Sequence, residues 1–262
     1  MIVKRMHGCG NSFILVDPET RYRNNGDVDI GKMKQLSGVE NLDADGLLVL
    51  TRPGGKEFGM QYYDIDRATK ELTKTAMCGN GIRCLARYAH DQYGTGSTFR
   101  ILTGDGVKEV TVSGSDVNVK MGPVKGLRKI ADDEYFLHNC IAHIVYLVPE
   151  LEFGESGHLE MARTKGRKTR YDQELMKRLG HPEGFQVNFS KKDDAHTIKN
   201  LTYEAGVEDL TLACGTGSVA AAYINAFAGG TSYPTMVINR GGDLVIDRKG
   251  RDLYMVGPAE YI

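Results

Sequence analysis

The chain lacks an excess of charge of either sign and has no long apolar run. Its 262 residues include 33 Lys and Arg and 34 Asp and Glu, which gives a formal net charge of −1. This balance offers no basis for binding a polyanion such as a nucleic acid. No apolar stretch approaches the ~20 residues that cross a bilayer, and residues 1–13 lack the apolar core of a signal peptide. We therefore expect a cytoplasmic protein without nucleic-acid or membrane partners.

Cysteine is also scarce, and its spacing argues against two common uses. No C-x2-C pair of the zinc-binding kind occurs, and an odd number of cysteines in a chain of this length argues against a disulfide framework. Neither a glycine-rich dinucleotide motif nor a lysine in an evident cofactor-anchoring motif is present. The sequence predicts reduced thiols, no metal site and no cofactor. The five cysteines are Cys9, Cys78, Cys84, Cys140 and Cys214.

Short runs of strand-forming residues, separated by turn residues, recur along the chain. Each half also holds one run with apolar residues at helical spacing, which predicts one buried helix per half. The helical runs are 81–94 and 217–230. The predicted strands are 13–17, 46–52, 58–65, 99–103, 108–114 and 117–121 in the first half, and 141–148, 185–190, 200–206, 235–240, 243–250 and 253–257 in the second.

The repeated plan predicts two lobes of similar α+β structure. We place the N-terminal lobe at residues 1–120, completed by about 256–262, and the C-terminal lobe at 121–255. Residues 154–183 are polar and basic. They have room for one helix, and we expect a solvated surface there rather than a nucleic-acid site.

Two phrases, MCGNG at 77–81 and ACGTG at 213–217, repeat one pattern at the starts of the two predicted helices. Their glycines allow backbone conformations closed to other residues and let a ligand approach the main chain. A helix start leaves N–H groups unpaired and is partly positive, so it suits a carboxylate or phosphate. The same end favours the thiolate form of a neighbouring cysteine.

One such phrase is a weak signal, because a buried cysteine beside a glycine turn is common. Two phrases in corresponding places suggest that two thiols serve one substrate. If the lobes face each other, a substrate carboxylate sits between the helix starts with a thiol on each face of its α-carbon. One thiolate then removes the α-proton and the opposite thiol delivers another, while main-chain N–H groups stabilise the developing charge.

Several further blocks, together with the two cysteine phrases, run from the first residues of the chain to the last. They are KRMHGCGNSFILVD (4–17), NLDADGLLVL (41–50), AMCGNGIRCLARY (76–88), VNVKMGP (117–123), PEGFQVNF (182–189), TYEAGVEDLTLACGTGSVAAA (202–222) and GGDLVI with LYMVGPA (241–259). In these blocks the chain resembles the diaminopimelate epimerase family. The resemblance implies two pseudo-symmetric lobes, each a mostly antiparallel sheet wrapped around a central helix. It also implies an isomerase that needs no pyridoxal phosphate and that uses Cys78 and Cys214 as its two bases; relatives often form homodimers.

For the reacting end of the substrate, the match to this family is good. The resemblance implies that Glu204 holds the amino group and that Asn11 contacts the substrate. The main-chain donors for the carboxylate would come from Gly79, Asn80, Gly215 and Thr216.

At the far end, where diaminopimelate carries its second amino-acid group, the chain departs from the family. Ala205 stands where the family has the arginine that clamps the second carboxylate, and an alanine cannot replace a bidentate guanidinium. Ile141 and Gln186 stand where asparagines are usual, and Leu210 replaces a glutamate. The nearest counterpart of a further asparagine is Asp64, in the altered stretch 64–74.

Loss of the charged partner should weaken binding of a second carboxylate by about 2–5 kcal/mol. We therefore expect a racemase of a free amino acid other than diaminopimelate, with histidine as one candidate and Asp64 as a partner for a basic side chain. Diaminopimelate itself is the alternative. Two other classes stay open: a thiol oxidoreductase, which the absence of C-x-x-C disfavours, and an inactive amino-acid-binding protein, which the two retained cysteines disfavour.

The remaining cysteines and histidines are assigned structural roles, because two thiols already supply the acid and the base. Cys84 is expected in the core and Cys9 in a glycine turn. Cys140 is expected in a buried strand, with a place in the lining of the substrate pocket as the alternative. His7 and His143 are expected to be structural, and Asp45 to make a turn or a supporting contact.

Overall fold

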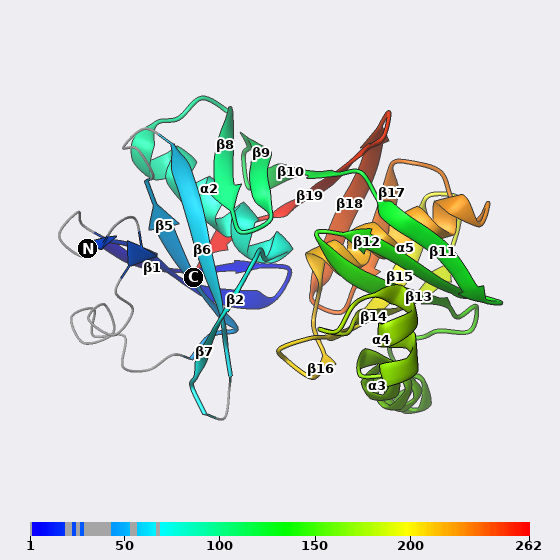
Figure 1. The fold of residues 1–262 in the computed structure, drawn as a ribbon. Helices are drawn as coiled ribbons and strands as arrows, with labels where there is room; N and C mark the ends of the chain where they lie inside the picture. Colours follow the sequence, from blue (N-terminus) through cyan, green and yellow to red (C-terminus); the bar gives the residue numbers. More distant parts are fainter. Residues whose placement is uncertain (1, 19–22, 25–26, 29–42, 53–56, 67–68) are drawn as a thin grey trace. The chain divides into compact units, whose positions relative to one another are not determined.

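The computed structural model describes residues 2–18, 23–24, 27–28, 43–52, 57–66 and 69–262. Residues 41–42 and 67–68, which belong to stretches discussed above, lie outside that set. The chain forms two compact units (Figure 1). Unit 1 comprises Met1–Val119 and Gly257–Ile262, and unit 2 comprises Lys120–Val256.

In the part that the structure describes, unit 1 is built from strands around one helix, α2 (Gly79–Tyr93). Its strands are β1 (Ile2–Gly8), β2 (Asn11–Asp17), β5 (Gly46–Thr51), β6 (Phe58–Ile65), β7 (Leu72–Thr75), β8 (Thr98–Thr103), β9 (Gly106–Ser113), the first part of β10 (Asp116–Gly122) and β20 (Glu260–Tyr261), with a separate ribbon of β3 (Arg23–Asn24) and β4 (Asp27–Val28).

Unit 2 has three helices: α3 (Ser156–Arg170), α4 (Gln173–Leu179) and α5 (Gly215–Phe227). Its strands are the last part of β10, β11 (Lys125–Ala131), β12 (Glu134–Asn139), β13 (Ile141–Leu147), β14 (Gln186–Lys192), β15 (Thr197–Glu204), β16 (Asp209–Leu210), β17 (Thr235–Asn239), β18 (Gly242–Lys249) and most of β19 (Asp252–Pro258), whose last two residues belong to unit 1.

The two units repeat one order of strand pairing. In unit 1, β1 and β2 form an antiparallel hairpin, β2 pairs parallel with β5, and β5 pairs antiparallel with β6. In unit 2, β12, β13, β14 and β15 follow the same sequence of pairings. One end of β6 then pairs with β7 and the other with β8, as β15 pairs with β16 and β17. The sequence therefore encodes one structural plan twice, and the predicted α+β class is confirmed.

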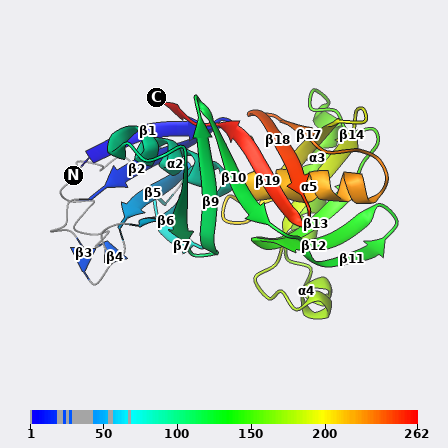
Figure 2. The ribbon, with the colours of Figure 1, turned by 90° about the horizontal axis from the view of Figure 1, so that it is seen from above.

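The two buried helices occupy equivalent places, each between the short strand and the next long strand of its unit. α5 packs against β12–β15, β17 and β18, as Figures 1 and 2 show. One apolar cluster joins it to the sheet through Ala220, Ile224, Leu137 and Val145. Both helices begin two residues before the predicted runs, because each preceding cysteine caps the helix start.

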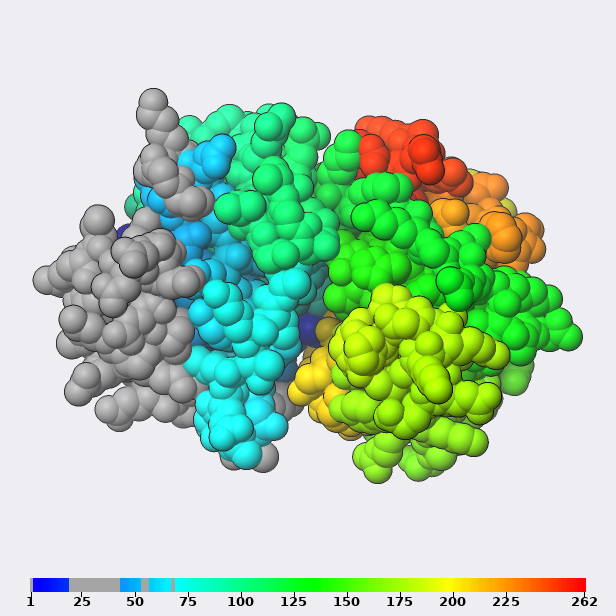
Figure 3. Space-filling model, in the orientation of Figure 1, coloured from blue at the N-terminus to red at the C-terminus, as the bar shows by residue number. Residues whose placement is uncertain are grey.

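The other face of the unit 2 sheet is covered by α3 and α4. Phe185, Tyr203 and Leu210 belong to the apolar cluster that packs there, together with Ala162 of α3 and Leu175 of α4. The yellow-green atoms of these helices lie at the surface in Figure 3, in agreement with the predicted solvated segment.

The expectation of one helix in residues 154–183 is wrong. The Asp172 side chain accepts a hydrogen bond from the main-chain N–H of Leu175 at 2.9 Å and starts α4. Gly180 then ends α4 in the left-handed conformation. The cap at Asp172 therefore divides the polar run into two helices, and Gly180 ends the second.

Several strands escaped prediction because their sequences lack the apolar alternation of a half-buried strand. β11 reads KGLRKIA and is exposed along most of its length. β1 and β12 were also missed, although each supplies the first arm of a hairpin. Among the described residues, no helix has the length and apolarity needed to span a membrane.

We predict that Gly166→Ala lowers the free energy of unfolding of the protein by about 1–3 kcal/mol. A methyl group at Gly166 would lie 2.6 Å from Cβ of Tyr203, so α3 and β15 must separate to admit it. Gly157, on the same helix, has no atom within 4 Å of its added methyl group. Gly157→Ala is the matched control and should leave stability equal or raise it by up to ~1 kcal/mol. Urea denaturation measures both, and equal effects would contradict the packing described here.

Candidate functional site

Cys78 is the N-terminal cap of α2, and its side-chain sulfur accepts a hydrogen bond from the first turn of the helix. Its backbone is extended (φ −124°, ψ 124°), and its Sγ accepts from the main-chain N–H of Gly81 at 3.4 Å. Cys214 begins α5 in the same way, with φ −118°, ψ 118° and a 3.4 Å hydrogen bond from the N–H of Gly217. The sulfur thus occupies the place that a Ser or Asp oxygen takes at most helix starts. The two cysteine phrases open helices with nearly identical local geometry.

The first turn of each helix carries the residues predicted to bind a carboxylate. Gly79 and Asn80 follow Cys78, and Gly215 and Thr216 follow Cys214. A helix leaves its first N–H groups without internal acceptors, and its dipole makes that end partly positive. Both turns therefore suit a carboxylate that lies beside the sulfur.

The two cysteine turns pack against different kinds of side chain. In unit 1, a methyl group at Gly81 would lie 2.7 Å from Cδ2 of Leu48, an apolar contact. In unit 2, a methyl group at Gly217 would lie 2.4 Å from Oδ1 of Asn188 and 2.6 Å from Oγ1 of Thr202. Close packing favours glycine at both positions, but only the turn of unit 2 packs against polar side chains.

Strand register places one acidic residue at an equivalent position in each unit. Tyr62 of β6 pairs with Thr75, three residues before Cys78, and Thr202 of β15 accepts from the N–H of Thr211, three residues before Cys214. Tyr62 and Thr202 are therefore equivalent. Side chains on a strand alternate between faces, so the residues two positions further, Asp64 and Glu204, are equivalent and face the helix starts.

Asp64 is a largely buried carboxyl group on the helix-facing side of β6. The Tyr62 hydroxyl donates a hydrogen bond to its Oδ1 at 2.5 Å. Burial raises the pKa of Asp64 from 3.8 to about 6, and the Tyr62 hydrogen bond partly opposes this rise. The sequence-predicted acid is thus at the position that mirrors Glu204, the predicted amino-group ligand.

The far-end residues predicted from the family pattern lie in unit 2. The side chain of Gln186 accepts a hydrogen bond at Oε1 from the main-chain N–H of Ala205 at 2.8 Å, which fixes the end of β15. Leu210 packs in the apolar cluster under α3 and α4. That core position accounts for Leu210 without a ligand, so we do not retain it in the proposed site.

Asn11 and Ile141 are the first residues of β2 and β13, so they are equivalent in the two hairpins. The turns before them contain Cys9 (φ 52°) and Cys140 (φ 62°). The prediction that Cys140 lies in a buried strand is wrong, because the β12–β13 hairpin needs a residue with positive φ at its turn. Cys9 is in a turn, as predicted.

The other residues assigned structural roles are held by contacts within their units. The pKa of His143, which is fully buried, is lowered to about 3 by burial, so the imidazole is neutral at physiological pH. Cys84 is in the core, and burial raises the pKa of its thiol to about 12. Asp45 accepts from the main-chain N–H of Ser12 at 2.8 Å, a supporting contact as predicted.

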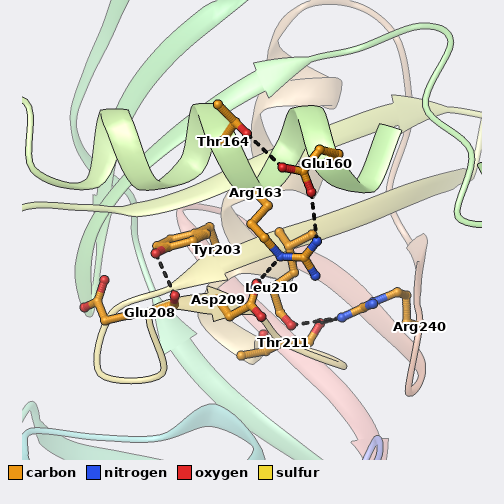
Figure 4. Close-up of polar contacts among 9 residues, drawn as sticks. All are labelled: Glu160, Arg163, Thr164, Tyr203, Glu208, Asp209, Leu210, Thr211 and Arg240. Atoms are coloured by element: carbon orange, nitrogen blue, oxygen red, sulfur yellow. Dashed lines mark hydrogen bonds and ion pairs between the residues drawn. The ribbon is translucent and has the colours of Figure 1, made fainter. Parts of the chain in front are cut away.

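Two arginines that sequence reasoning missed hold the segment before Cys214 (Figure 4). Arg240 donates to the main-chain oxygens of Leu210 and Thr211 at 2.9 and 3.2 Å. Arg163 of α3 donates to Asp209 at 2.7 Å. Residues 209–211 lead directly into the cysteine turn, so these bonds position Cys214 through the backbone.

Arg83, five residues after Cys78, was also missed. It is fully buried, yet it lies on a helix whose neighbouring residues are mostly apolar. The sequence did hold a signal for it, because Arg83 falls in the first turns of a helix that was predicted to be buried. A buried guanidinium needs several hydrogen-bond acceptors, so such an arginine indicates that acceptors lie near the helix start.

Within unit 1 the structure places the Asn80 turn directly after Cys78, and Asp64 lies on the strand that pairs with the segment leading into that turn. Within unit 2 the Thr216 turn follows Cys214, and Glu204 lies at the equivalent strand position. That both sets act on one substrate remains a prediction.

Asp64 should make stability fall as pH rises through about 6. Its folded-state pKa lies above the unfolded value, so its contribution is complete below about pH 4 and is lost by about pH 7. A rise from 3.8 to about 6 corresponds to at most about 3 kcal/mol. Asp64→Asn keeps an acceptor for Tyr62 but has no charge, so its urea midpoint should exceed that of the wild type at pH 8 and match it at pH 4. A constant difference across this range would show that Asp64 does not titrate as described.

Comparison with known proteins shows similarity to diaminopimelate epimerases along most of the chain. Residues 3–127 match the family model described as diaminopimelate epimerase. The diaminopimelate epimerase of Archaeoglobus fulgidus is 32% identical over 98% of this chain and 93% of its own length. That of Methanocella arvoryzae is 31% identical, again over 98% of this chain and 93% of its own length.

Two solved structures share the fold at low sequence identity. A predicted epimerase from Pseudomonas aeruginosa has a TM-score of 0.72 at 10% identity and is matched over 99% of this chain and 96% of its own. A hydroxyproline epimerase from Agrobacterium vitis, with bound trans-4-hydroxy-L-proline, has a TM-score of 0.69 at 12% identity over 99% and 88% of the two chains. With the thiol-capped helix in each unit, these similarities lead to one assignment: the chain belongs to the diaminopimelate epimerase family of isomerases.

Proposed function

We propose that the protein inverts the α-carbon of a free amino acid by two-base proton transfer between Cys78 and Cys214, without a cofactor. The observation that carries this proposal is the duplicated helix start, in which a cysteine sulfur and the N–H groups of the first turn lie side by side in both units. One thiol alone can remove and return a proton on a single face. Inversion needs a donor on the opposite face, and the second unit supplies it.

The proton transfers balance in a simple way. One cysteine, as thiolate, takes the α-proton and becomes a thiol. The electron pair left on the α-carbon is delocalised into the carboxylate, whose charge the first-turn N–H groups stabilise. The other cysteine, as thiol, donates its proton to the opposite face and becomes a thiolate. The reverse reaction uses the same groups with their roles exchanged.

Glu204 fits the role of amino-group ligand in this scheme. It lies on the face of β15 that the cysteine turn packs against, and the β15–β16 pairing fixes its backbone. A carboxylate there pairs with the substrate ammonium and orients the Cα–H bond. Asn11 and the turns at Asn80 and Thr216 complete the proposed contacts.

For the substrate, the relatives favour diaminopimelate, which was the alternative in the sequence analysis, over a different amino acid. The matched proteins named above are diaminopimelate epimerases, and nothing in the comparisons favours histidine. We therefore propose LL-diaminopimelate as the first candidate substrate.

A second candidate, an amino acid with one basic side chain, keeps specific support. Ala205 has no guanidinium for a second carboxylate, and its N–H is already bonded to Gln186. Asp64 suits a cationic group, because a buried carboxylate gains most from a charged partner. Diaminopimelate and the basic amino acids both carry such a group, so Asp64 is compatible with either candidate.

We predict that Cys78→Ala and Cys214→Ala each slow inversion of the substrate by about 10²- to 10⁴-fold, the usual contribution of a general acid or base. Circular dichroism of the reaction mixture follows inversion, and NMR in D2O follows exchange of the α-proton. Cys84→Ala is the control, because this thiol lies in the core of the same helix. Inversion at the wild-type rate in either catalytic variant would refute the two-thiol proposal.

We also predict that LL-diaminopimelate exchanges its α-proton faster than L-histidine, L-lysine or uncharged L-norleucine. NMR in D2O with each compound in turn measures this order. Exchange with histidine or lysine alone would identify the second candidate and show that the loss of arginine at position 205 sets specificity. Binding without exchange of any compound would instead indicate an amino-acid-binding protein.

A further inference from the structure

The two cysteine turns have nearly the same backbone conformation, but the side chains that follow in the next turn of each helix differ in charge. The fifth residue after Cys78 is Arg83, whereas the fifth residue after Cys214 is Val219. Both side chains are fully buried. The internal repeat is therefore broken by a cation at an equivalent position of only one unit.

The guanidinium of Arg83 folds back onto the cysteine turn of its own helix. Its Nη1 donates to Oδ1 of Asn80 at 2.9 Å and to the main-chain oxygen of Gly79 at 3.3 Å. These two residues follow Cys78 directly and form the proposed carboxylate site. Arg83 thus fixes the side chain of Asn80 and adds a full positive charge behind the helix start.

Two further bonds tie this guanidinium to the rest of unit 1. Its Nε donates to the main-chain oxygen of Pro258 at 3.2 Å, and its Nη2 donates to Sγ of Cys9 at 3.3 Å. A methyl group at Gly8 would lie 3.0 Å from Nη2. The cation is therefore enclosed on several sides, where charge is screened less than in water.

The side chains that lie against Gly217 in unit 2 are neutral. Gly217 lies on Asn188 and Thr202, and the Thr202 hydroxyl donates to Oδ1 of Asn188 at 2.9 Å. His143, which approaches Asn188 at 3.2 Å, is neutral because burial lowers its pKa to about 3. The Cys214 turn consequently has the helix dipole, but the position equivalent to Arg83 holds Val219, and Arg240 binds main-chain oxygens three and four residues before the cysteine.

We propose that Arg83 is a positioning residue that makes Cys78 the resting thiolate and leaves Cys214 as the thiol. A cation within one helical turn favours a thiolate over a thiol, and unit 2 lacks that cation. The role of this asymmetry in turnover rests on the proposed function, because two-base inversion needs one thiolate and one thiol at the start of each cycle. Two equally acidic thiols would leave a larger share of the enzyme with both protonated or both ionised.

Other titratable groups near α2 do not reproduce this difference between the units. Asp64 opposes a thiolate at Cys78, but its equivalent Glu204 does so at Cys214. The Tyr88 hydroxyl donates to Asp17 at 3.0 Å, and Lys108 is paired with Asp105 at 2.5 Å. The titratable groups on and around α2 include Asp17, Tyr62, Asp64, Lys108, Cys9, Cys84, Arg87, Tyr88, His90, Asp91 and Tyr261. Those on and around α5 include Tyr135, His143, Glu204, Tyr223 and Arg248. Arg240 contacts the main chain at Leu210 and Thr211, before the Cys214 turn.

Alkylation of the reduced, substrate-free protein tests the proposal without turnover. Iodoacetamide reacts with the thiolate, so mass spectrometry of each cysteine peptide from pH 5 to 9 gives a midpoint for each thiol. Midpoints are compared rather than rates, because Cys214 is only 4% exposed. We expect the Cys78 midpoint to lie about one pH unit or more below that of Cys214.

Variants separate the charge from mere packing. Arg83→Met should raise the Cys78 midpoint by about one pH unit, and Arg83→Lys, which keeps the charge, should restore most of the difference. Val219→Ala loosens the equivalent position of unit 2 without a change of charge and should leave the Cys214 midpoint in place.

Equal midpoints in the wild type, or a Cys78 midpoint that stays unchanged in a folded Arg83→Met protein, would overturn the inference. If Arg83→Met does not fold, the wild-type comparison and Arg83→Lys still decide. Failure of the proposed function would appear differently, as absence of α-proton exchange with every compound while the alkylation midpoints differ as expected.

Discussion

The hydrogen bond from a glycine N–H to the sulfur of a helix-capping cysteine is the constraint on which the rest of the site depends. It occurs at 3.4 Å in both units and sets where the thiol lies relative to the first turn. A carboxylate held by that turn then has its α-carbon near the sulfur. Glycine is needed at the donor position because Leu48 in one unit, and Asn188 with Thr202 in the other, leave no room for a methyl group.

The strand register extends this constraint to the acidic residues. Because β6 and β15 pair with the segments that lead into the cysteine turns, Asp64 and Glu204 occupy equivalent strand positions in the two units. One plan, used twice, thus gives a thiol, an anion-binding turn and an acid. The proposed function requires the two copies to differ, and they do. Unit 1 has Arg83 where unit 2 has Val219, and its cysteine turn packs on Leu48 where that of unit 2 packs on Asn188 and Thr202.

Much of this could be read from the sequence, for physical reasons that particular residues show. The cysteine phrases predicted the helix starts because glycine and an N-terminal cap have strong local signatures. β11 was missed because apolar and polar residues do not alternate along it, and the division of residues 154–183 depended on a single cap at Asp172. Arg83 could not be assigned a role because its acceptors include Cys9 and Pro258, the second of which is 175 positions away. Cys140 was misplaced because a hairpin turn here uses a residue type that rarely adopts positive φ.

The measurement that tests the two-base account most directly is a partial conversion in D2O, stopped before one turnover per enzyme on average. Substrate and inverted product are separated, and mass spectrometry measures deuterium at the α-carbon of each, with LL-diaminopimelate first and any other compound that exchanges second. The account predicts one deuterium in the product and none in the recovered substrate, because the proton is removed and delivered by different thiols. Product that retains the original proton, or deuterium at equal levels in both, would show that a single base serves both faces.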